Sequence, residues 1–86
     1  MWYVYVIKSL RSDYWYTGVT NDLRKRFGQH QAGQRGWTKR HVPYKLIYYE
    51  ASMHEADALA RERYLKTGMG KRYLKNRLKR FLSLTG

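Results

Sequence analysis

Two short runs of aromatic and β-branched residues, close together at the start of the chain, limit its fold more than any other feature. The first run is Met1–Ser9 (MWYVYVIKS) and the second is Tyr14–Thr20 (YWYTGVT), with the polar segment Leu10–Asp13 between them. Such residues favour extended backbone, and two runs joined by a short polar link are typical of a β-hairpin. We therefore expect the fold to be organised around an antiparallel hairpin.

The pattern predicts a helix directly after the hairpin. Thr20 or Asn21 is expected to cap it, because a side-chain oxygen at a helix start accepts a backbone N–H. The helix is expected to end near Ala32, since Gly33 readily adopts the conformation that closes a helix. Residues 33–42 then read as a polar loop that carries several cations.

The second half of the chain predicts one strand and two helices. The strand is Tyr44–Glu50 (YKLIYYE). The sequence Ser52-Met53-His54-Glu55 matches a capping box, in which Ser accepts a backbone N–H and Glu reaches back to the start of the helix. This helix is expected to run to about Thr67 and to break at the two glycines that follow. Apolar residues at helical spacing predict the last helix within Lys71–Leu84.

These elements predict an α+β fold in the order β-β-α-β-α-α, with helices flanking a small three-stranded antiparallel sheet. The 86 residues fit one domain, residues 1–86. The chain has no Cys, which excludes disulfides and thiolate metal sites. It has no apolar run of about 18 residues to span a membrane and no pattern of a secretory signal. We therefore expect a cytoplasmic protein.

The charge of the chain indicates a polyanionic partner. Lys and Arg number 18 against six Asp and Glu, which gives a net charge of +12 at pH 7. This surplus repels itself unless a polyanion is bound. Basic groups that neutralise phosphates release counterions and so supply affinity for nucleic acid. Nucleic acid is therefore the favoured partner, ahead of an anionic membrane surface or a basic surface that only contacts water.

Glu62 interrupts the apolar face of the second predicted helix. At about 100° per residue, Ala58, Leu59 and Leu65 share one stripe of that helix. Glu62 projects from the middle of the stripe. A carboxylate aimed at a core is costly unless a cation, a metal or water meets it. Its position alone leaves open a structural salt bridge with an inward Arg, a place at the rim of the core, and a metal-binding role.

Four other polar residues lie beside the predicted core. Arg26 and His30 are one turn apart on the first helix, to one side of its apolar face, and are expected to emerge along the edge of the sheet. Tyr5 and Tyr16 lie in the two hairpin strands. Taken alone, each of these four residues is also consistent with a purely structural role. Together with Glu62 they supply the base, the cationic group and the single Mg²⁺-holding carboxylate that phosphodiester hydrolysis requires.

At this point the chain resembles the GIY-YIG endonuclease family. Tyr3-Val4-Tyr5, followed after ten residues by Tyr16-Thr17-Gly18, is similar to the paired signature of that family. The segment Asn21–His30 is similar to the helix that follows the signature, and Ala60-Arg61-Glu62 to the segment with the metal-binding glutamate. Residues 67–77 look like the small stand-alone bacterial members. The likeness therefore covers nearly the whole chain.

The resemblance implies cleavage of DNA that depends on one Mg²⁺ or Mn²⁺ ion. It implies that Tyr5 is the general base or holds the attacking water, and that Tyr16 positions water and phosphate. It implies that Arg26 stabilises the pentavalent phosphorus and that His30 contacts phosphate or assists proton transfer. Glu62 would hold the metal opposite the leaving oxygen.

The predicted function is therefore that of a metal-dependent DNA endonuclease, acting at branched, damaged or single-stranded sites as in DNA repair. The alternatives are a non-catalytic nucleic-acid-binding module on the same scaffold and a structural protein of a ribonucleoprotein. Target choice would come from the basic surface, from a partner protein or from DNA structure. Trp37 either stacks on a base or packs beneath its own loop. The residues expected to contact DNA are Arg35, Trp37, Lys39, Arg40, Lys71, Arg72, Lys75, Asn76 and Arg77.

Overall fold

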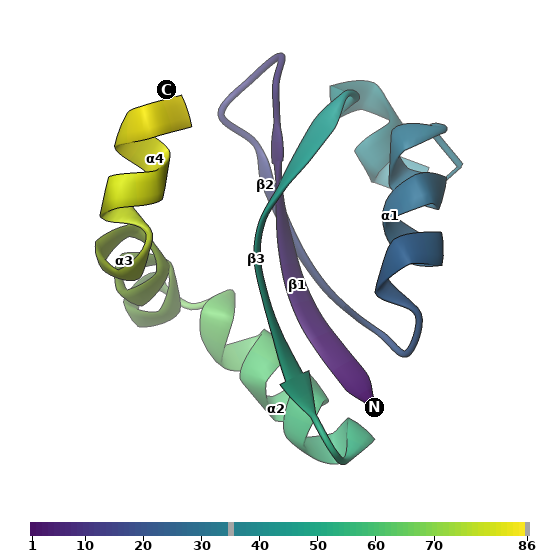
Figure 1. Ribbon diagram of the computed structural model, residues 1–86, viewed down its shortest axis with the longest axis vertical. Coiled ribbons are helices and arrows are strands. Elements are labelled where there is room, and N and C mark those ends of the chain that lie inside the picture. The colour runs from purple at the N-terminus through teal and green to yellow at the C-terminus, as the bar shows by residue number, and fades with distance from the viewer. Residues whose placement is uncertain (35, 86) are drawn as a thin grey trace.

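The computed structural model describes residues 1–34 and 36–85, and it is built around a three-stranded antiparallel sheet (Figure 1). The strands are β1 (Trp2–Ser9), β2 (Trp15–Thr20) and β3 (Tyr44–Ser52). Their order in the sheet is β2-β1-β3, so β1 is the central strand and pairs with both neighbours. The predicted α+β class and the predicted hairpin are confirmed, and the third strand is found to pair on the far side of β1.

Helices cover both faces of the sheet. They are α1 (Leu23–Gln31), the 3₁₀-helix η1 (Gly36–His41), α2 (Glu55–Leu65), α3 (Gly68–Arg77) and α4 (Lys79–Thr85). Figure 1 shows α1 and η1 to the right of the sheet, and α2, α3 and α4 below it and to its left. Among the described residues, no helix combines the length and the apolar character needed to cross a membrane.

The side chains of β1 alternate between two separate cores. Val4 and Val6 pack with residues of α2, α3 and α4, while Tyr5 and Ile7 pack with residues of α1. All four are fully buried, because successive residues of a strand point to opposite faces and here both faces are covered. The sheet therefore separates the α1 side from the α2 side, and the two sides meet only around the outer edges of β2 and β3.

The first helix begins later than predicted. Asp22, and not Thr20 or Asn21, caps α1: its side chain accepts the backbone N–H of Lys25 at 3.0 Å. Thr20 instead accepts the N–H of Asp22 at 3.1 Å in the preceding turn. The predicted end is confirmed, since Gly33 has a φ of 73°, which glycine adopts most readily.

The predicted capping box at Ser52 is wrong. Ser52 still pairs with Trp2, because β3 continues past Glu50 to the end of the sheet. His54 caps α2 in its place, and its Nδ1 accepts the backbone N–H of Ala56 at 3.2 Å. The helix therefore starts close to the predicted place for a different local reason.

The glycines after α2 begin a helix and do not break one. Thr67 caps α3, and its hydroxyl accepts the N–H of Gly70 at 3.0 Å. A Cβ at Gly70 would collide with the carbonyl of Tyr64 at the end of α2, so glycine allows the two helices to approach closely. The predicted last helix is divided near Leu78 into α3 and α4.

Candidate active site

A chain of hydrogen bonds is buried between β1, α1 and η1. The hydroxyl of Tyr5 lies 2.8 Å from Nε2 of His30, and Nδ1 of His30 lies 2.9 Å from the hydroxyl of Thr38. Tyr44 donates to the carbonyl of Thr38 at 2.7 Å. Tyr5 and His30 are fully buried. The prediction that His30 emerges along the edge of the sheet is therefore wrong, because the predicted loop forms η1 and places Thr38 on the imidazole.

Gly18 makes room for this cluster. Tyr5 stands opposite Gly18 in the pairing of β1 with β2. A Cβ on Gly18 would lie 2.7 Å from the hydroxyl of Tyr5 and 3.0 Å from the ring of Tyr16. Contacts this short would force one of two packed rings to move. Gly18 of the Tyr16-Thr17-Gly18 segment is thus required by the side chain of Tyr5 in the Tyr3-Val4-Tyr5 segment.

Tyr16 connects the buried cluster to the surface. Its ring centroid lies 4.9 Å from that of His30 and 6.2 Å from that of Tyr5. Tyr16 is only partly buried, and the residue also borders a surface pocket on the other side of β2. The three aromatic residues predicted for the site are therefore in mutual contact, with Tyr16 outermost.

Arg26 lies against the edge strand of the sheet. Its Nη1 donates to the carbonyl of Val19 in β2 at 3.4 Å, and the side chain is partly buried. The contact is long for a hydrogen bond, so it positions the guanidinium weakly. The prediction that this residue emerges along the sheet edge is confirmed.

Glu62 lies on α2, on the face of the sheet opposite Tyr5 and His30. Its Oε2 is 3.1 Å from Nζ of Lys66, one turn further along the helix, and its side chain is 19% exposed while that of Lys66 is 55% exposed. Ala58 and Leu65 are buried as predicted and Leu59 is 37% exposed, so the buried stripe is turned away from Leu59, and Glu62 is partly buried at its margin. Glu62 therefore occupies the rim of the core.

The ion pair that joins α2 to the sheet is formed by the neighbouring residue, Arg61. Its Nε donates to Oε1 of Glu50 in β3 at 3.1 Å, and Tyr48 donates to the same oxygen at 2.6 Å. The guanidinium also lies 4.9 Å from the ring centre of Tyr73. Burial and the adjacent Glu50 carboxylate raise the pKa of Tyr48 to about 12. This cluster joins β3 to α2 and α3.

A pocket rich in lysine opens between β2 and the junction of α2 with α3. Its volume is about 780 Å³, and Tyr16 and Thr17 of β2 line one side of it. Three cations, Lys66, Lys71 and Lys75, line it as well, against one acid, Asp13. The pocket therefore suits an anion beside the exposed part of Tyr16.

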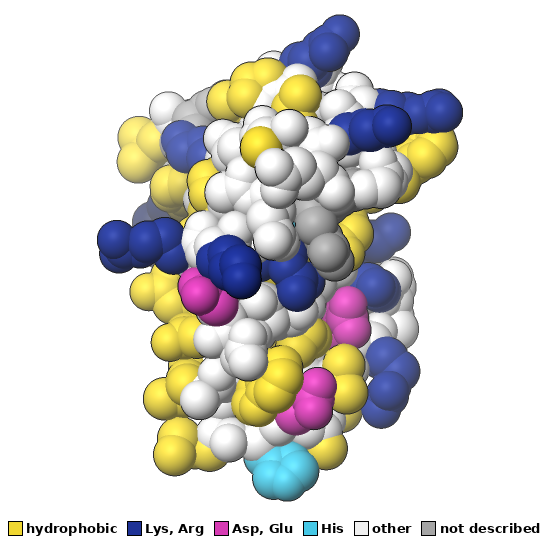
Figure 2. All heavy atoms as spheres, turned by 90° about the vertical axis from the view of Figure 1, so that its right-hand side faces the viewer, with side chains coloured by type: hydrophobic (Ala, Val, Ile, Leu, Met, Phe, Trp, Pro, Cys, Tyr) yellow, Lys and Arg dark blue, Asp and Glu magenta, His cyan; other side chains and the backbone are white. Residues whose placement is uncertain are grey.

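The residues predicted to contact DNA lie on two surfaces. On η1, Trp37 is 60% exposed, and the guanidinium of Arg40 lies 4.8 Å from its ring centre. Trp37 is therefore not packed beneath its own loop. The neighbouring Lys39 is exposed, and Arg35 lies outside the described residues. Figure 2 shows Lys and Arg side chains over the upper part and the sides of the face that carries α1 and η1.

The second predicted surface is α3. Its predicted DNA-contacting residues are all exposed: Lys71, Arg72, Lys75, Asn76 and Arg77. Lys71 and Lys75 also line the lysine-rich pocket. Arg72 and Asn76 line a shallower hollow of about 380 Å³ with Met69 and Tyr73. The basic face of α3 thus continues directly from the pocket beside Tyr16.

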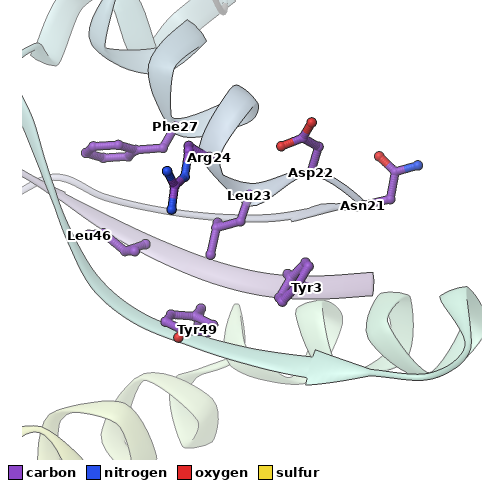
Figure 3. Close-up of a pocket in the computed structure, with 8 residues that line it drawn as sticks. All are labelled: Tyr3, Asn21, Asp22, Leu23, Arg24, Phe27, Leu46 and Tyr49. Carbon is purple, nitrogen blue, oxygen red and sulfur yellow. The ribbon is translucent and has the colours of Figure 1, made fainter. Parts of the chain in front are cut away.

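A further groove, of about 510 Å³, lies between the start of α1 and the sheet (Figure 3). Leu23 points from α1 toward the sheet, and Tyr3 and Tyr49 form the opposite side. The rings of Tyr3 and Tyr49 meet edge to face, with centroids 6.2 Å apart. None of the five residues predicted to be catalytic is among those that line this groove.

Two residues of the site were not found by sequence reasoning. Thr38 stands in a polar stretch without periodicity, so no pattern marked it as the partner of His30. Lys66 did carry a signal, because a Lys four residues after a Glu on a helix is well placed to pair with it. The structure brings Tyr5, Tyr16 and His30 together, sets Arg26 at the adjoining edge, and leaves Glu62 on α2 across the sheet.

Comparison with known proteins defines the class of this domain. Residues 1–76 match the family described as "GIY-YIG catalytic domain". The chain belongs to the GIY-YIG family, whose members are generally nucleases.

Its relatives include small bacterial proteins of the UPF0213 group. It is 39% identical over 65 residues to the UPF0213 protein CPE1444 of Clostridium perfringens, which covers 74% of this chain and 69% of the relative. It is 35% identical over 74 residues to the UPF0213 protein SSP2268 of Staphylococcus saprophyticus, covering 85% and 89%.

A solved structure shares the fold. The solution NMR structure of the UPF0213 protein BH0048 from Bacillus halodurans is similar with a TM-score of 0.54 and 28% sequence identity. The similarity covers 88% of this chain and 84% of that chain. It supports the α+β architecture described above.

Proposed function

We propose that this protein is a metal-dependent endonuclease that hydrolyses DNA phosphodiester bonds at the outer edge of β2. The observation that carries the proposal is the convergence of two helices, α1 and α2, on this strand. Arg26 of α1 contacts β2 from one face. Lys66, one turn after Glu62 on α2, lines a pocket with Tyr16 from the other face. A guanidinium, a phenol and the carboxylate-bearing turn of a helix thus lie at one edge strand of the sheet.

Glu62 suits a role as the metal ligand. Mg²⁺ needs only one or two carboxylates, because it keeps several waters and takes substrate phosphate oxygens as further ligands. The described residues hold no group of three or more metal-binding side chains, so among them a cage made only of protein ligands is absent, whereas a single-carboxylate site is available. The metal, Mg²⁺ or Mn²⁺, would supply Lewis-acid stabilisation of the charge that develops on the phosphate and the leaving oxygen.

We assign Tyr16 and Arg26 to the reacting phosphate. The ring of Tyr16 is partly buried on the α1 side of β2, where Arg26 also contacts the strand, and its hydroxyl is suited to orient the attacking water against the phosphorus. Among the described residues, the guanidinium of Arg26 makes one weak hydrogen bond, so it is available to donate to the phosphate oxygens as their charge increases.

We assign Tyr5 and His30 to positioning. Both are closed to solvent in this structure, and their hydrogen bond holds two rings against Tyr16. The family resemblance implies that Tyr5 is the general base or holds the attacking water and that His30 contacts phosphate or assists proton transfer, and these roles would require η1 to move away from His30. A positioning role needs no such movement.

The basic surfaces are suited to hold the DNA backbone on either side of the edge. Lys71 and Lys75 extend from the pocket along α3, and Lys39 and Arg40 lie on η1. The exposed Trp37 ring offers a stacking face to an unpaired base. Branched, damaged and single-stranded DNA all provide such bases.

A cleavage panel tests the proposal. End-labelled duplex, nicked, flap and single-stranded DNAs are incubated with the protein in Mg²⁺, in Mn²⁺ and in EDTA, beside Glu62→Ala. We expect metal-dependent cleavage of at least one substrate, lost in Glu62→Ala while DNA binding, measured by fluorescence anisotropy, is retained.

Two outcomes would overturn the proposal. If the wild-type protein cleaves no substrate in either metal, the chain is a non-catalytic nucleic-acid-binding module. If cleavage persists unchanged in Glu62→Ala, the metal-binding carboxylate is elsewhere. Tight RNA binding with no effect of metal would favour a ribonucleoprotein component, and titrations across salt concentrations separate this from phosphate attraction alone.

A further inference from the structure

The Glu62–Lys66 pair places a cation on the carboxylate that we assign to the metal. Nζ of Lys66 lies 3.1 Å from Oε2 of Glu62. An ammonium at this distance occupies one side of the carboxylate and lowers its affinity for a second cation by direct repulsion. Lys66 and a divalent ion therefore compete for Glu62.

The side chain of Lys66 also has access to the lysine-rich pocket. It lines the lysine-rich pocket together with Lys71, Lys75 and Tyr16. Its side chain is 55% exposed, whereas that of Glu62 is 19% exposed. The ammonium is thus the more accessible member of the pair, and rotation about its flexible stem can move its charge without disturbing the helix. A phosphate in the pocket would meet three lysines from two helices.

We propose that Lys66 couples metal binding to DNA binding by exchanging partners. In the free protein it neutralises Glu62, and when DNA enters the pocket it contacts a backbone phosphate and leaves the carboxylate to the divalent ion. The inference depends on the proposed function, in which Glu62 is the metal ligand. Linkage requires the coupling to be reciprocal, so that metal on Glu62 also strengthens the contact of Lys66 with DNA.

The pocket supplies a matched control. Lys71 lines the same pocket, is exposed like Lys66, and lies on a helix, α3. Glu62 forms its described ion pair with Lys66 and not with Lys71. Lys66→Met and Lys71→Met remove the same charge, and Met keeps both the length of the side chain and a high helix propensity. Only Lys66→Met also removes the partner of Glu62.

The first experiment measures metal affinity without DNA. Free Mn²⁺ is followed by electron paramagnetic resonance during titration of the full chain at low ionic strength. We expect Lys66→Met to tighten Mn²⁺ binding roughly two- to fivefold, the range expected for loss of one partly exposed ion pair. Lys71→Met should tighten it by less than half as much, and Glu62→Gln should abolish binding at this site.

The second experiment measures DNA affinity in EDTA, where no metal takes part. A fluorescent duplex is titrated with wild type, Lys66→Met, Lys71→Met and the same two changes in a Glu62→Gln background. We expect Lys66→Met to weaken binding less than Lys71→Met in the wild-type background. In the Glu62→Gln background the two changes should weaken binding equally, because Lys66 is then no longer held by the carboxylate.

The outcomes separate this inference from the proposed function. If Glu62→Gln abolishes Mn²⁺ binding but both lysine variants leave it unchanged, Lys66 is not the competitor and the inference is wrong while the metal role of Glu62 stands. If Glu62→Gln leaves Mn²⁺ binding intact, the metal role fails and the inference fails with it. Circular dichroism confirms in each case that the variants remain folded.

Discussion

Arg61 and Glu62 are neighbours on α2, yet their ion pairs differ in kind. Arg61 joins two elements: it donates to Glu50 in β3 at 3.1 Å and lies over the ring of Tyr73 in α3. Glu62 pairs within its own helix, with Lys66 at 3.1 Å. We call these the bridging pair, Arg61–Glu50, and the local pair, Glu62–Lys66.

The difference identifies which charges can take new partners. Opening the bridging pair leaves a partly buried carboxylate oxygen, which Tyr48 also contacts, without its charged partner and removes one link between β3 and α2, so it costs folding free energy. Opening the local pair costs about 0.3–0.5 kcal/mol, the usual value for an i,i+4 pair. The two arginines differ in the same way, since Arg26 has one contact of 3.4 Å. Under the proposed function, we expect the charges that are held within one helix or by one weak contact to meet substrate and metal, and not those that bridge elements.

The sharpest test of this comparison exchanges each carboxylate for its amide. Glu62→Gln should reduce metal-dependent cleavage by about 10³-fold or more, because the amide is a poor ligand for Mg²⁺ and the remaining charge stabilisation is lost. Its midpoint of thermal unfolding should stay within about 2 °C of wild type. Single-turnover cleavage and calorimetry give the two values. Comparable cleavage by wild type and Glu62→Gln would break the comparison.

Arg26→Ala should have the next largest effect. We expect cleavage to slow by at least about 10²-fold, the scale for losing one preorganised charged donor. Arg24→Ala removes the same charge from the exposed side of the same helix and serves as the control, with an expected change below about threefold. The measurement is the rate at saturating protein. Equal rates for the two variants would remove Arg26 from the site.

Removing the charge of the bridging pair should lower stability and leave cleavage almost unchanged, the opposite of the effect expected for Glu62→Gln. Glu50→Gln is expected to lower the free energy of unfolding by about 1–2 kcal/mol, since Arg61 and Tyr48 lose a charged acceptor in a partly buried setting. Cleavage by the folded variant should remain within about threefold of wild type. Urea unfolding followed by circular dichroism measures the first effect. A variant that is fully stable but inactive would reverse the assignment of the two pairs.

Sequence reasoning predicted the fold well where the signal was local. The hairpin and β3 are short runs whose composition reports extended backbone directly. Ser52 was misread as a cap because the capping motif does not reveal that β3 continues to pair with Trp2. Whether a residue ends a strand or begins a helix depends on a partner strand far along the chain, which a local pattern does not contain.

The sequence predicts which residues belong to the candidate site better than it predicts how they are oriented and buried. Helical periodicity gives the direction of Glu62 relative to Ala58 and Leu65, but it does not tell how far the helix is rotated against the sheet. Leu59, expected in the buried stripe, is therefore 37% exposed. The burial of His30 depends on Thr38, which reaches it from a 3₁₀ turn that carries no periodic signal.

The smallest expected effect concerns the pH dependence of the bridging pair. Burial and Glu50 raise the pKa of Tyr48 to about 12 in the folded protein, while an unfolded tyrosine titrates near 10. A group whose pKa is raised on folding stabilises the protein fully below its unfolded pKa, and this contribution is lost as pH rises through the folded value. The free energy of unfolding should therefore fall between about pH 10 and pH 12.

Tyr48→Phe isolates this contribution. The variant lacks the phenol, so its free energy of unfolding should fall less steeply over the same pH range. Some fall should remain, because burial also raises the pKa of Tyr14 and of Tyr44. Urea unfolding at a series of pH values gives the slopes. Identical slopes for wild type and Tyr48→Phe would mean that burial and Glu50 do not raise the pKa of Tyr48 in the folded protein.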